Sequence, residues 1–155
     1  MPQLQPADES FFDTAPTRLS HRWSIARPAS EVWAELVGNQ AMHWCRGLSV
    51  NWTSPRPFGV GTTRQVTVLG VLKVQEHYFA WEEGRRKAFY ASAVNIPLFS
   101  GIAEDYLVEP DGADRCTFTW KVAVQPSALG KPGAPVNGLL FNSFFKDTGR
   151  HFDAS

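Results

Sequence analysis

Apolar and polar residues alternate from Thr17 to Ile25, which predicts a strand with one buried face. Pro28 ends this strand. Ser30 is a suitable N-cap for a short helix over Glu31 to Val37, where apolar residues recur at helical spacing. A second short helix is expected over Gln40 to Trp44.

From residue 48 onward the apolar residues follow a period of two almost throughout. Turn-forming Gly, Pro and Asp residues divide this part of the chain into six further predicted strands: Leu48–Thr53, Thr62–Leu69, Leu72–Trp81, Lys87–Ile96, Ile102–Glu109 and Arg115–Gln125. Because tight turns join them, the strands are expected to form an antiparallel sheet.

The last part of the chain predicts one long helix. Gly and Pro in residues 130–135 end the sheet, and the helix is expected to follow to about Phe152. At 100° steps one arc of this helix is apolar: Leu140, Phe141, Phe144, Phe145 and Phe152. The only large surface that can cover this arc is the sheet. The sequence thus predicts one α+β domain over residues 17–155, in which a curved sheet of about seven strands wraps the helix and leaves a hollow. Residues 1–16 are expected to form a flexible arm.

The turn around Gly70 predicts a specific strand pairing. A three-residue loop over Leu69 to Val71, with Gly70 in the left-handed conformation, makes the apolar faces of the flanking strands coincide. In this register Arg64 lies directly opposite Glu76, on an apolar face where an unpaired charge is costly. Two interpretations stay open: the pair only fixes the register, or it is a polar anchor in the wall of a cavity.

The composition narrows the possible partners. The 155 residues are 43% hydrophobic, and 15 Lys and Arg balance 15 Asp and Glu. Nucleic acid is not expected as a partner, because phosphate binding requires an excess of basic residues. No apolar run approaches the roughly 18 residues that cross a membrane. No secretory signal is recognisable, so a cytoplasmic location is expected. The oligomeric state is expected to be a monomer or a homodimer.

Few residues have the spacing that metal or cofactor chemistry requires. Cys45 and Cys116 cannot form a disulfide framework and lack metal-ligand spacing. Gly59 and Gly61 precede a strand and not a helix, so they do not form a dinucleotide site. No cofactor and no metal are therefore expected. His21 shares a strand face with apolar residues, which favours a packed histidine over a catalytic base.

Aromatic residues are the unusual part of the composition: 11 Phe, 6 Trp and 3 Tyr. They either form a bulky core or line a cavity. The strand faces and the helix arc direct many of them to the space between sheet and helix: Trp23, Tyr78, Tyr90, Tyr106, Phe118, Trp120, Phe141, Phe144 and Phe145. Glu104 alternates with Tyr106 and is a candidate for a second inward-pointing carboxylate.

Several short motifs resemble one known superfamily. Residues 25–33 (IARPASEVW) resemble the segment that opens helix-grip domains, and residues 59–64 (GVGTTR) resemble the family's G-x-G-x-x-R motif at the start of a strand. Trp44, Glu76 and residues 110–112 also fall at matching places. Residues 17 to 152 therefore resemble the SRPBCC or START-like helix-grip superfamily, which includes polyketide cyclase/dehydrase and lipid-transport-like bacterial proteins.

The resemblance implies an internal cavity for an apolar or amphipathic small molecule. It implies that Arg46 is a basic residue facing that cavity, that Glu76 is its acidic residue, and that Tyr90 is an aromatic one, with Ser92 two residues on. The gate loop of the plant-receptor branch is missing, since only Leu69 to Val71 stands in its place. A hormone-gated receptor function is therefore not expected.

Three functions are compatible with these residues. The favoured one is binding or carriage of a small hydrophobic, lipid- or polyketide-like ligand. The first alternative is a polyketide aromatase/cyclase-like enzyme, with Glu76, Glu104, Tyr106 and His21 as candidate residues for enolisation and dehydration. The second alternative is a co-chaperone-like protein-interaction module, which requires an exposed apolar patch. Carriage is favoured because a pocket is indicated more clearly than a base or a nucleophile.

Overall fold

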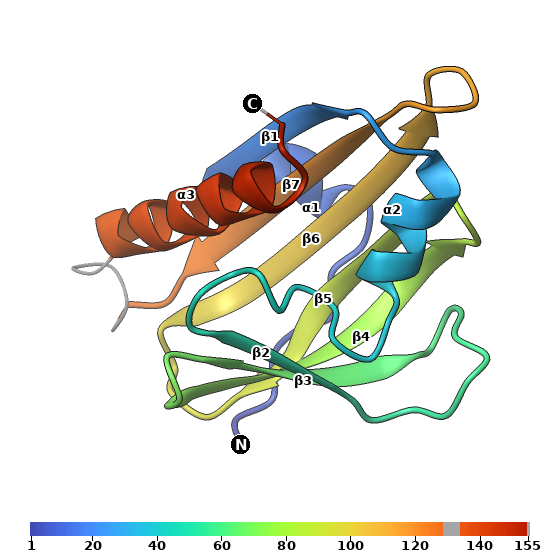
Figure 1. The fold of residues 1–155 in the computed structure, drawn as a ribbon. Helices are drawn as coiled ribbons and strands as arrows, with labels where there is room; N and C mark the ends of the chain where they lie inside the picture. The colour runs from blue at the N-terminus through green and yellow to red at the C-terminus, as the bar shows by residue number, and fades with distance from the viewer. Residues whose placement is uncertain (129–133, 155) are drawn as a thin grey trace.

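A computed structural model describes residues 1–128 and 134–154 (Figure 1). Its strands are β1 (Thr17–Ile25), β2 (Leu48–Trp52), β3 (Thr63–Val68), β4 (Leu72–Glu82), β5 (Arg86–Val94), β6 (Phe99–Pro110) and β7 (Cys116–Pro126). Its helices are α1 (Phe11–Thr14), α2 (Ala29–Leu36) and α3 (Ala134–His151). The seven predicted strands and the long C-terminal helix are confirmed.

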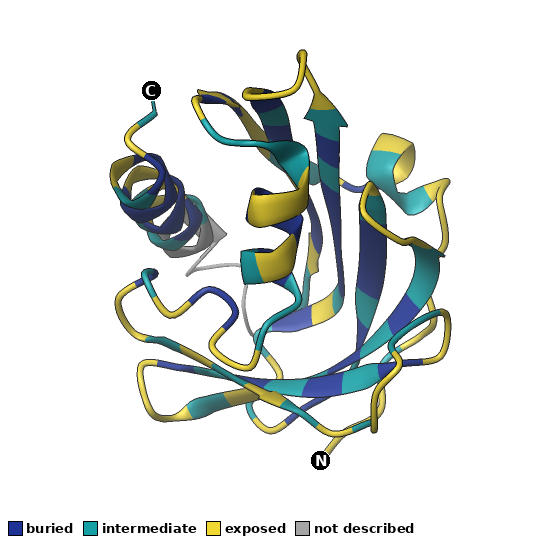
Figure 2. Ribbon diagram, turned by 45° about the vertical axis from the view of Figure 1, so that its right-hand side comes forward, coloured by how far each residue is buried: buried dark blue, intermediate teal, exposed yellow. Residues whose placement is uncertain are grey.

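All seven strands form one antiparallel sheet in the order β1-β7-β6-β5-β4-β3-β2. The sheet curves around α2 and α3, and α1 lies on its other, convex side (Figures 1 and 2). The edge strands β1 and β2 are not paired with each other, so the sheet stays open. The α+β helix-grip fold is therefore confirmed.

The connection between β1 and β2 differs in detail from the expectation. Helix α2 begins at Ala29 with Pro28 as its N-cap residue, and Ser30 makes no capping hydrogen bond. Gln40–Trp44 forms successive turns and not a second helix; the amide of His43, for example, donates to the carbonyl of Gln40. The predicted break over residues 130–135 lies largely outside the described residues.

Aromatic rings form a continuous row across the concave face of the sheet. Trp23 stacks on Phe118 with ring centres 5.2 Å apart, and Phe118 contacts Tyr106 at 5.8 Å. Tyr106 contacts Phe89 at 5.9 Å, and Phe89 contacts Tyr78 at 5.2 Å. All five side chains are buried. Since stacked and edge-to-face pairs stabilise beyond simple burial, this row stabilises the concave face against which α3 packs.

The C-terminal half of α3 lies very close to β1. A Cβ added to Gly149 would lie 2.9 Å from the carbonyl oxygen of Ala154 and 3.1 Å from Nε1 of Trp23. Only glycine therefore allows this approach of helix to sheet. Within the described part of the chain, no helix combines the length and hydropathy that crossing a membrane requires.

Residues 1–16 run along the convex face of the sheet (Figure 1). The amide of Leu4 donates to the carbonyl of Ser92 at 2.8 Å, and Phe12 contacts the ring of Phe79. The ring of Phe11 lies against Gly101, where an added Cβ would be 3.3 Å from it. The flexibility expected for this arm stays a prediction.

Candidate functional site

The β3–β4 hairpin positions the central ion pair. Leu69 and Gly70 both adopt positive φ values, 52° and 73°, and the amide of Val71 donates to the carbonyl of Val68. This turn pairs Val68 with Leu72 and places Arg64 opposite Glu76. The predicted register is confirmed, although Leu69 shares the left-handed conformation expected for glycine alone.

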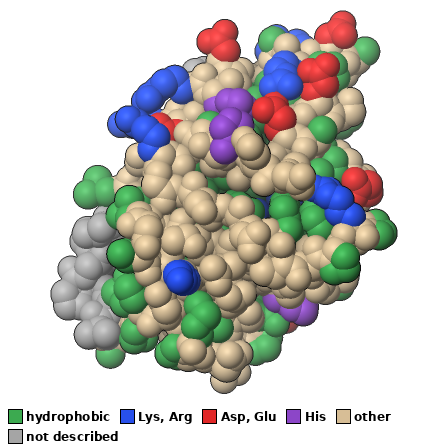
Figure 3. Space-filling model, turned by 60° about the horizontal axis from the view of Figure 1, so that its bottom comes forward, with side chains coloured by type: hydrophobic (Ala, Val, Ile, Leu, Met, Phe, Trp, Pro, Cys, Tyr) green, Lys and Arg blue, Asp and Glu red, His purple; other side chains and the backbone are tan. Residues whose placement is uncertain are grey.

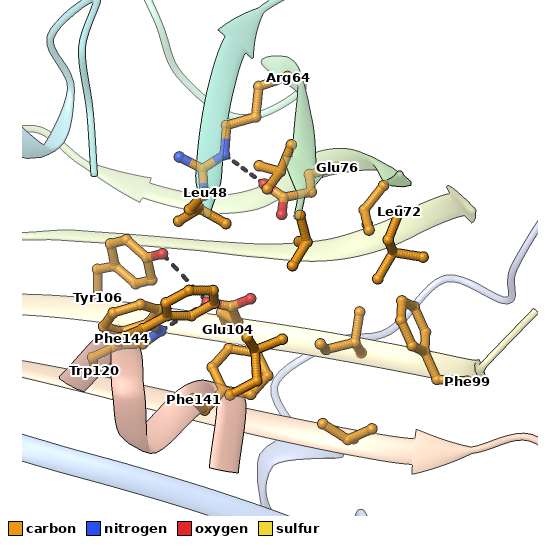
Figure 4. Close-up of a pocket in the computed structure, with 16 residues that line it drawn as sticks. Leu48, Arg64, Leu72, Glu76, Phe99, Glu104, Tyr106, Trp120, Phe141 and Phe144 are labelled. Atoms are coloured by element: carbon orange, nitrogen blue, oxygen red, sulfur yellow. Dashed lines mark hydrogen bonds and ion pairs between the residues drawn. The ribbon is translucent and has the colours of Figure 1, made fainter. Parts of the chain in front are cut away.

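A cavity of about 60 Å³ lies between the concave face and the N-terminal half of α3. Most of its wall is apolar and comes from the following residues: Leu48, Val66, Val68, Leu72, Val74, Phe99, Ile102, Val124, Leu140, Phe141 and Phe144. Its polar wall residues are Arg64, Glu76, Glu104, Tyr106 and Trp120 (Figure 4). The hollow predicted between sheet and helix thus exists, but it is much smaller than the ~300–1,000 Å³ of typical small-molecule sites.

Arg64 and Glu76 form a buried ion pair, with Nε of Arg64 2.5 Å from Oε2 of Glu76. Both side chains are almost fully buried. The guanidinium also lies over the ring of Phe89, 4.7 Å from its centre. Nη1 of Arg64 is buried and has no hydrogen-bond partner among the described residues. Since buried donors are nearly always paired, this atom is a vacant donor beside the cavity.

Glu104 approaches the cavity from the opposite wall (Figure 4). Its Oε1 accepts a hydrogen bond from Nε1 of Trp120 at 2.7 Å and one from the hydroxyl of Tyr106 at 3.3 Å. Burial, reinforced by the negative charge of Glu76, raises the pKa of Glu104 to about 8. Glu104 is therefore a neutral carboxylic acid at pH 7, able to donate a hydrogen bond.

Lys87 is a buried polar residue that the sequence did not reveal as part of this region. Its Nζ donates to the carbonyl of Leu36 at 2.7 Å and lies 3.4 Å from the hydroxyl of Tyr78. Burial, and secondly the charge of Arg64, lower the pKa of Lys87 well below its ordinary value. In the sequence, Lys87 stands two residues before Phe89 at the start of a predicted strand. A lysine in such a position is normally expected to be exposed.

Five predicted ligand contacts line the cavity besides Glu76: Arg64, Tyr106, Trp120, Phe141 and Phe144. Four others are buried on the same side of the sheet but outside the cavity wall: Trp23, Tyr78, Phe118 and Phe145. They belong to the aromatic core that supports the cavity. Phe145, for example, contacts Trp120 with ring centres 5.2 Å apart.

Arg46 and His21 lie at the surface, not in the cavity. The Arg46 side chain is 75% exposed and pairs with Asp147 on α3 at 3.1 Å. His21 is exposed and packs on the ring of Trp23. Both line a shallow groove along α3. The two side chains therefore lie at the surface beside α3, outside the cavity.

Tyr90 and Ser92 lie on the convex face, and the reason is a bulge in β4. The β4–β5 turn pairs Glu82 with Arg86, a register that would bring Tyr90 opposite Tyr78. An irregularity between Tyr78 and Ala80 shifts the pairing by one residue, so that Tyr78 faces Phe89. Such a shift exchanges the two faces of a strand. Tyr90 consequently packs against His77, 5.4 Å between ring centres, and the Ser92 hydroxyl donates to the carbonyl of Gln75.

Comparison with known proteins gives this cavity a context. Residues 16–151 match the family described as polyketide cyclase/dehydrase and lipid transport. The chain belongs to this family. It is 31% identical over 153 residues to uncharacterized proteins of Mycobacterium tuberculosis and Mycobacterium bovis, with 94% of this chain and 90% of the relatives covered.

Solved structures share the fold of this family member. A START superfamily protein from Mycobacterium smegmatis superposes with a TM-score of 0.71 at 11% identity, covering 88% of this chain and 97% of that one. A major latex-like protein from Panax ginseng superposes with a TM-score of 0.59 at 16% identity, with the same coverage. At these identities the likeness establishes the fold alone.

Proposed function

We propose that the protein binds and carries a small amphipathic molecule in the cavity, with the polar end of the molecule at Arg64 and Glu104. The vacant Nη1 of Arg64 is the observation that carries this proposal. A buried donor without an acceptor costs about 1–3 kcal/mol, and an oxygen atom of a ligand would remove that cost. The apolar wall and the family's description support an apolar remainder of the ligand.

A lipid- or polyketide-sized ligand requires a larger cavity, and α3 is the element suited to move. Among the described residues, the polar contacts of α3 with the rest of the chain lie between Phe144 and His151. The preceding part contributes Leu140 and Phe141 to the cavity wall. Displacing this half exposes apolar contacts without breaking those hydrogen bonds.

The proposal is tested by titrating the protein with a fluorescent fatty acid, cis-parinaric acid, and with the corresponding alcohol. We expect the acid to bind, and the double variant Arg64→Met/Glu76→Met to bind it about tenfold more weakly, because the loss of one charged hydrogen bond costs about 1.5–3 kcal/mol. Val124→Phe, which fills the cavity, should abolish binding of both probes, whereas Val60→Phe at an exposed position should not. Binding that survives Val124→Phe would contradict the proposal.

Glu104 supports a second candidate function, in which the protein assists the enolisation step of a cyclase-like reaction. A neutral carboxylic acid and an unpaired guanidinium donor face one apolar cavity, and both can donate to the carbonyl oxygen, which gains charge while solvent water takes the α-proton and the enol forms. The test is deuterium exchange at the α-carbon of an acetoacetyl thioester in heavy water, followed by NMR. If Glu104→Gln and the wild type exchange at the uncatalysed rate, the enzymatic candidate fails and carriage remains.

A further inference from the structure

Three large apolar side chains are exposed next to residues that line the cavity. Leu69 is 66% exposed, Val71 63% and Leu139 70%. Leu69 and Val71 form the tip of the β3–β4 turn, between the cavity-lining Val68 and Leu72. Leu139 precedes Leu140, which lines the cavity from α3. These three side chains therefore lie around one end of the cavity, whereas the exposed Met1 and Val60 lie elsewhere.

The segments at this end carry basic residues, and one buried acidic residue, Asp147, adjoins them and pairs with Arg46. We call them the rim: residues 46–49, 68–73, 94–100 and 138–146, each of which contributes to the cavity wall or adjoins a residue that does. Their charged residues are Arg46, Lys73 and Lys146, all exposed. Leu139, Arg46 and Lys146 line one groove along α3, and the amide of Leu69 donates to the carbonyl of Gly47 at 2.7 Å. Apolar and basic side chains thus share one surface.

The opposite end of the sheet carries acidic and basic residues together. The β6–β7 turn, over residues 109–115, carries Glu109, Asp111 and Asp114 against Arg115. The β4–β5 turn carries Glu82 and Glu83 together with Arg85 and Arg86, so its charges balance, and it has no apolar tip. In Figure 3 most acidic side chains lie along the upper and right-hand edges of the view. The rim therefore differs from this end by its excess of basic over acidic residues.

From this arrangement we propose that the rim docks on the surface of an anionic lipid bilayer. Apolar tips flanked by basic residues match a bilayer interface, where apolar side chains enter the acyl boundary and anionic headgroups attract nearby Lys and Arg side chains. The cavity then opens toward the membrane, the source of an apolar ligand. The surface is independent of which ligand the cavity holds.

Vesicle sedimentation tests the proposal with the full chain. We expect the wild type to bind vesicles of phosphatidylcholine and phosphatidylglycerol in equal parts, and to bind phosphatidylcholine alone much more weakly. Leu69→Ser/Val71→Ser should weaken binding about tenfold, because two apolar side chains no longer enter the interface. Lys73→Glu/Lys146→Glu should weaken it by more than tenfold on the anionic vesicles, and added salt should do the same to the wild type.

Matched controls lie at the far end of the molecule. Val60→Ser removes an apolar side chain that is 70% exposed, and Arg85→Glu reverses an exposed basic residue; neither should alter vesicle binding. Cis-parinaric acid binding by the rim variants shows that they are folded and separates failure of this proposal from failure of the carrier function. The proposal is overturned if the wild type ignores both vesicles, if Val60→Ser matches the rim variants, or if the rim variants only convert a dimer to a monomer.

Discussion

Four ionisable side chains, Arg64, Glu76, Lys87 and Glu104, are buried around one layer of aromatic rings. The low-dielectric surroundings disfavour isolated charges: burial lowers the pKa of Lys87 well below its ordinary value and raises the pKa of Glu104 to about 8, so Glu104 is mainly uncharged at pH 7. Arg64 and Glu76 are in contact and neutralise each other. The cavity wall is therefore polar at the Arg64–Glu76 pair and at Glu104, but it carries no net charge at pH 7.

Replacing Glu104 should change how stability depends on pH. Its pKa rises from an ordinary value of 4.5 to about 8 in the folded protein, so the folded state binds the extra proton between these values. The free energy of unfolding should consequently fall with rising pH by up to about 1.4 kcal/mol per unit, and level off above the folded pKa. Glu104→Gln should remove this fall, as measured by urea unfolding across the same range.

The exposed Glu82→Gln is the matched control for this experiment, because that side chain lies at the surface. It should leave the pH dependence unchanged. An unaltered slope in Glu104→Gln would show that the carboxyl group is ionised in the folded protein.

Residue placement followed from the sequence where one turn determines it. Gly70 and the apolar faces fixed the opposition of Arg64 and Glu76 without knowledge of the rest of the fold. The sequence predicts Tyr90 on the cavity side, but the bulge near Ala80 moves it to the convex face. This bulge depends on packing across the sheet and not on the β4–β5 turn. The burial of Lys87 was not predicted for a related reason, since it depends on the carbonyl of Leu36, which is distant in sequence.

Helix α3 combines two different kinds of attachment. Its C-terminal half is held by polar contacts: Asp147 accepts from the backbone amide of Arg46 at 3.0 Å, Trp44 donates to Thr148 at 3.0 Å, and His151 contacts Glu35 at 2.8 Å. Its earlier residues contribute apolar side chains to the cavity. The helix was predictable from its apolar arc, but these polar anchors were not, because no periodicity reports a partner more than 100 residues away.

Hydrogen exchange should resolve these two halves. We expect amides over residues 138–143 to exchange at least about tenfold faster than those over 145–151, because local opening of the first half breaks fewer tertiary contacts. Mass spectrometry of peptic peptides measures the difference, and cis-parinaric acid should reduce it. Uniform exchange along α3 would show that the helix opens as one unit.

The whole molecule is a single curved sheet with helices on its concave side and the N-terminal arm on its convex side. The arm closes over the sheet through Phe11 against Gly101, Phe12 against Phe79, and an ion pair between Glu9 and Arg86 at 2.7 Å. The antiparallel arrangement of the seven strands and the position of α3 against the sheet were predictable, since tight turns join the strands and one apolar arc needs a cover, whereas the pairing of β1 with β7 was not predicted. The course of residues 1–16 was not, because their apolar residues are too few to form a pattern.

Deleting residues 1–12 should lower the free energy of unfolding by about 2 kcal/mol, since two half-buried phenylalanines lose their contacts. Urea unfolding of the truncated and complete chains measures this difference. Deleting residues 1–7 is the control, because Glu9, Phe11 and Phe12 remain, and it should cost less than half as much. Equal stability of all three chains would show that the arm is flexible in solution.

The edge strands β1 and β2 are not paired with each other, and this affects the rate at which a ligand can enter the cavity. Helix α3 lies between these two edge strands. Widening the space between sheet and helix therefore separates no hydrogen-bonded strands. Ligand uptake should then proceed at the rate of a helix displacement, on the order of microseconds to milliseconds, and not at the far slower rate of unfolding. Under the proposed carrier function, one folded molecule should therefore exchange its ligand many times before it unfolds.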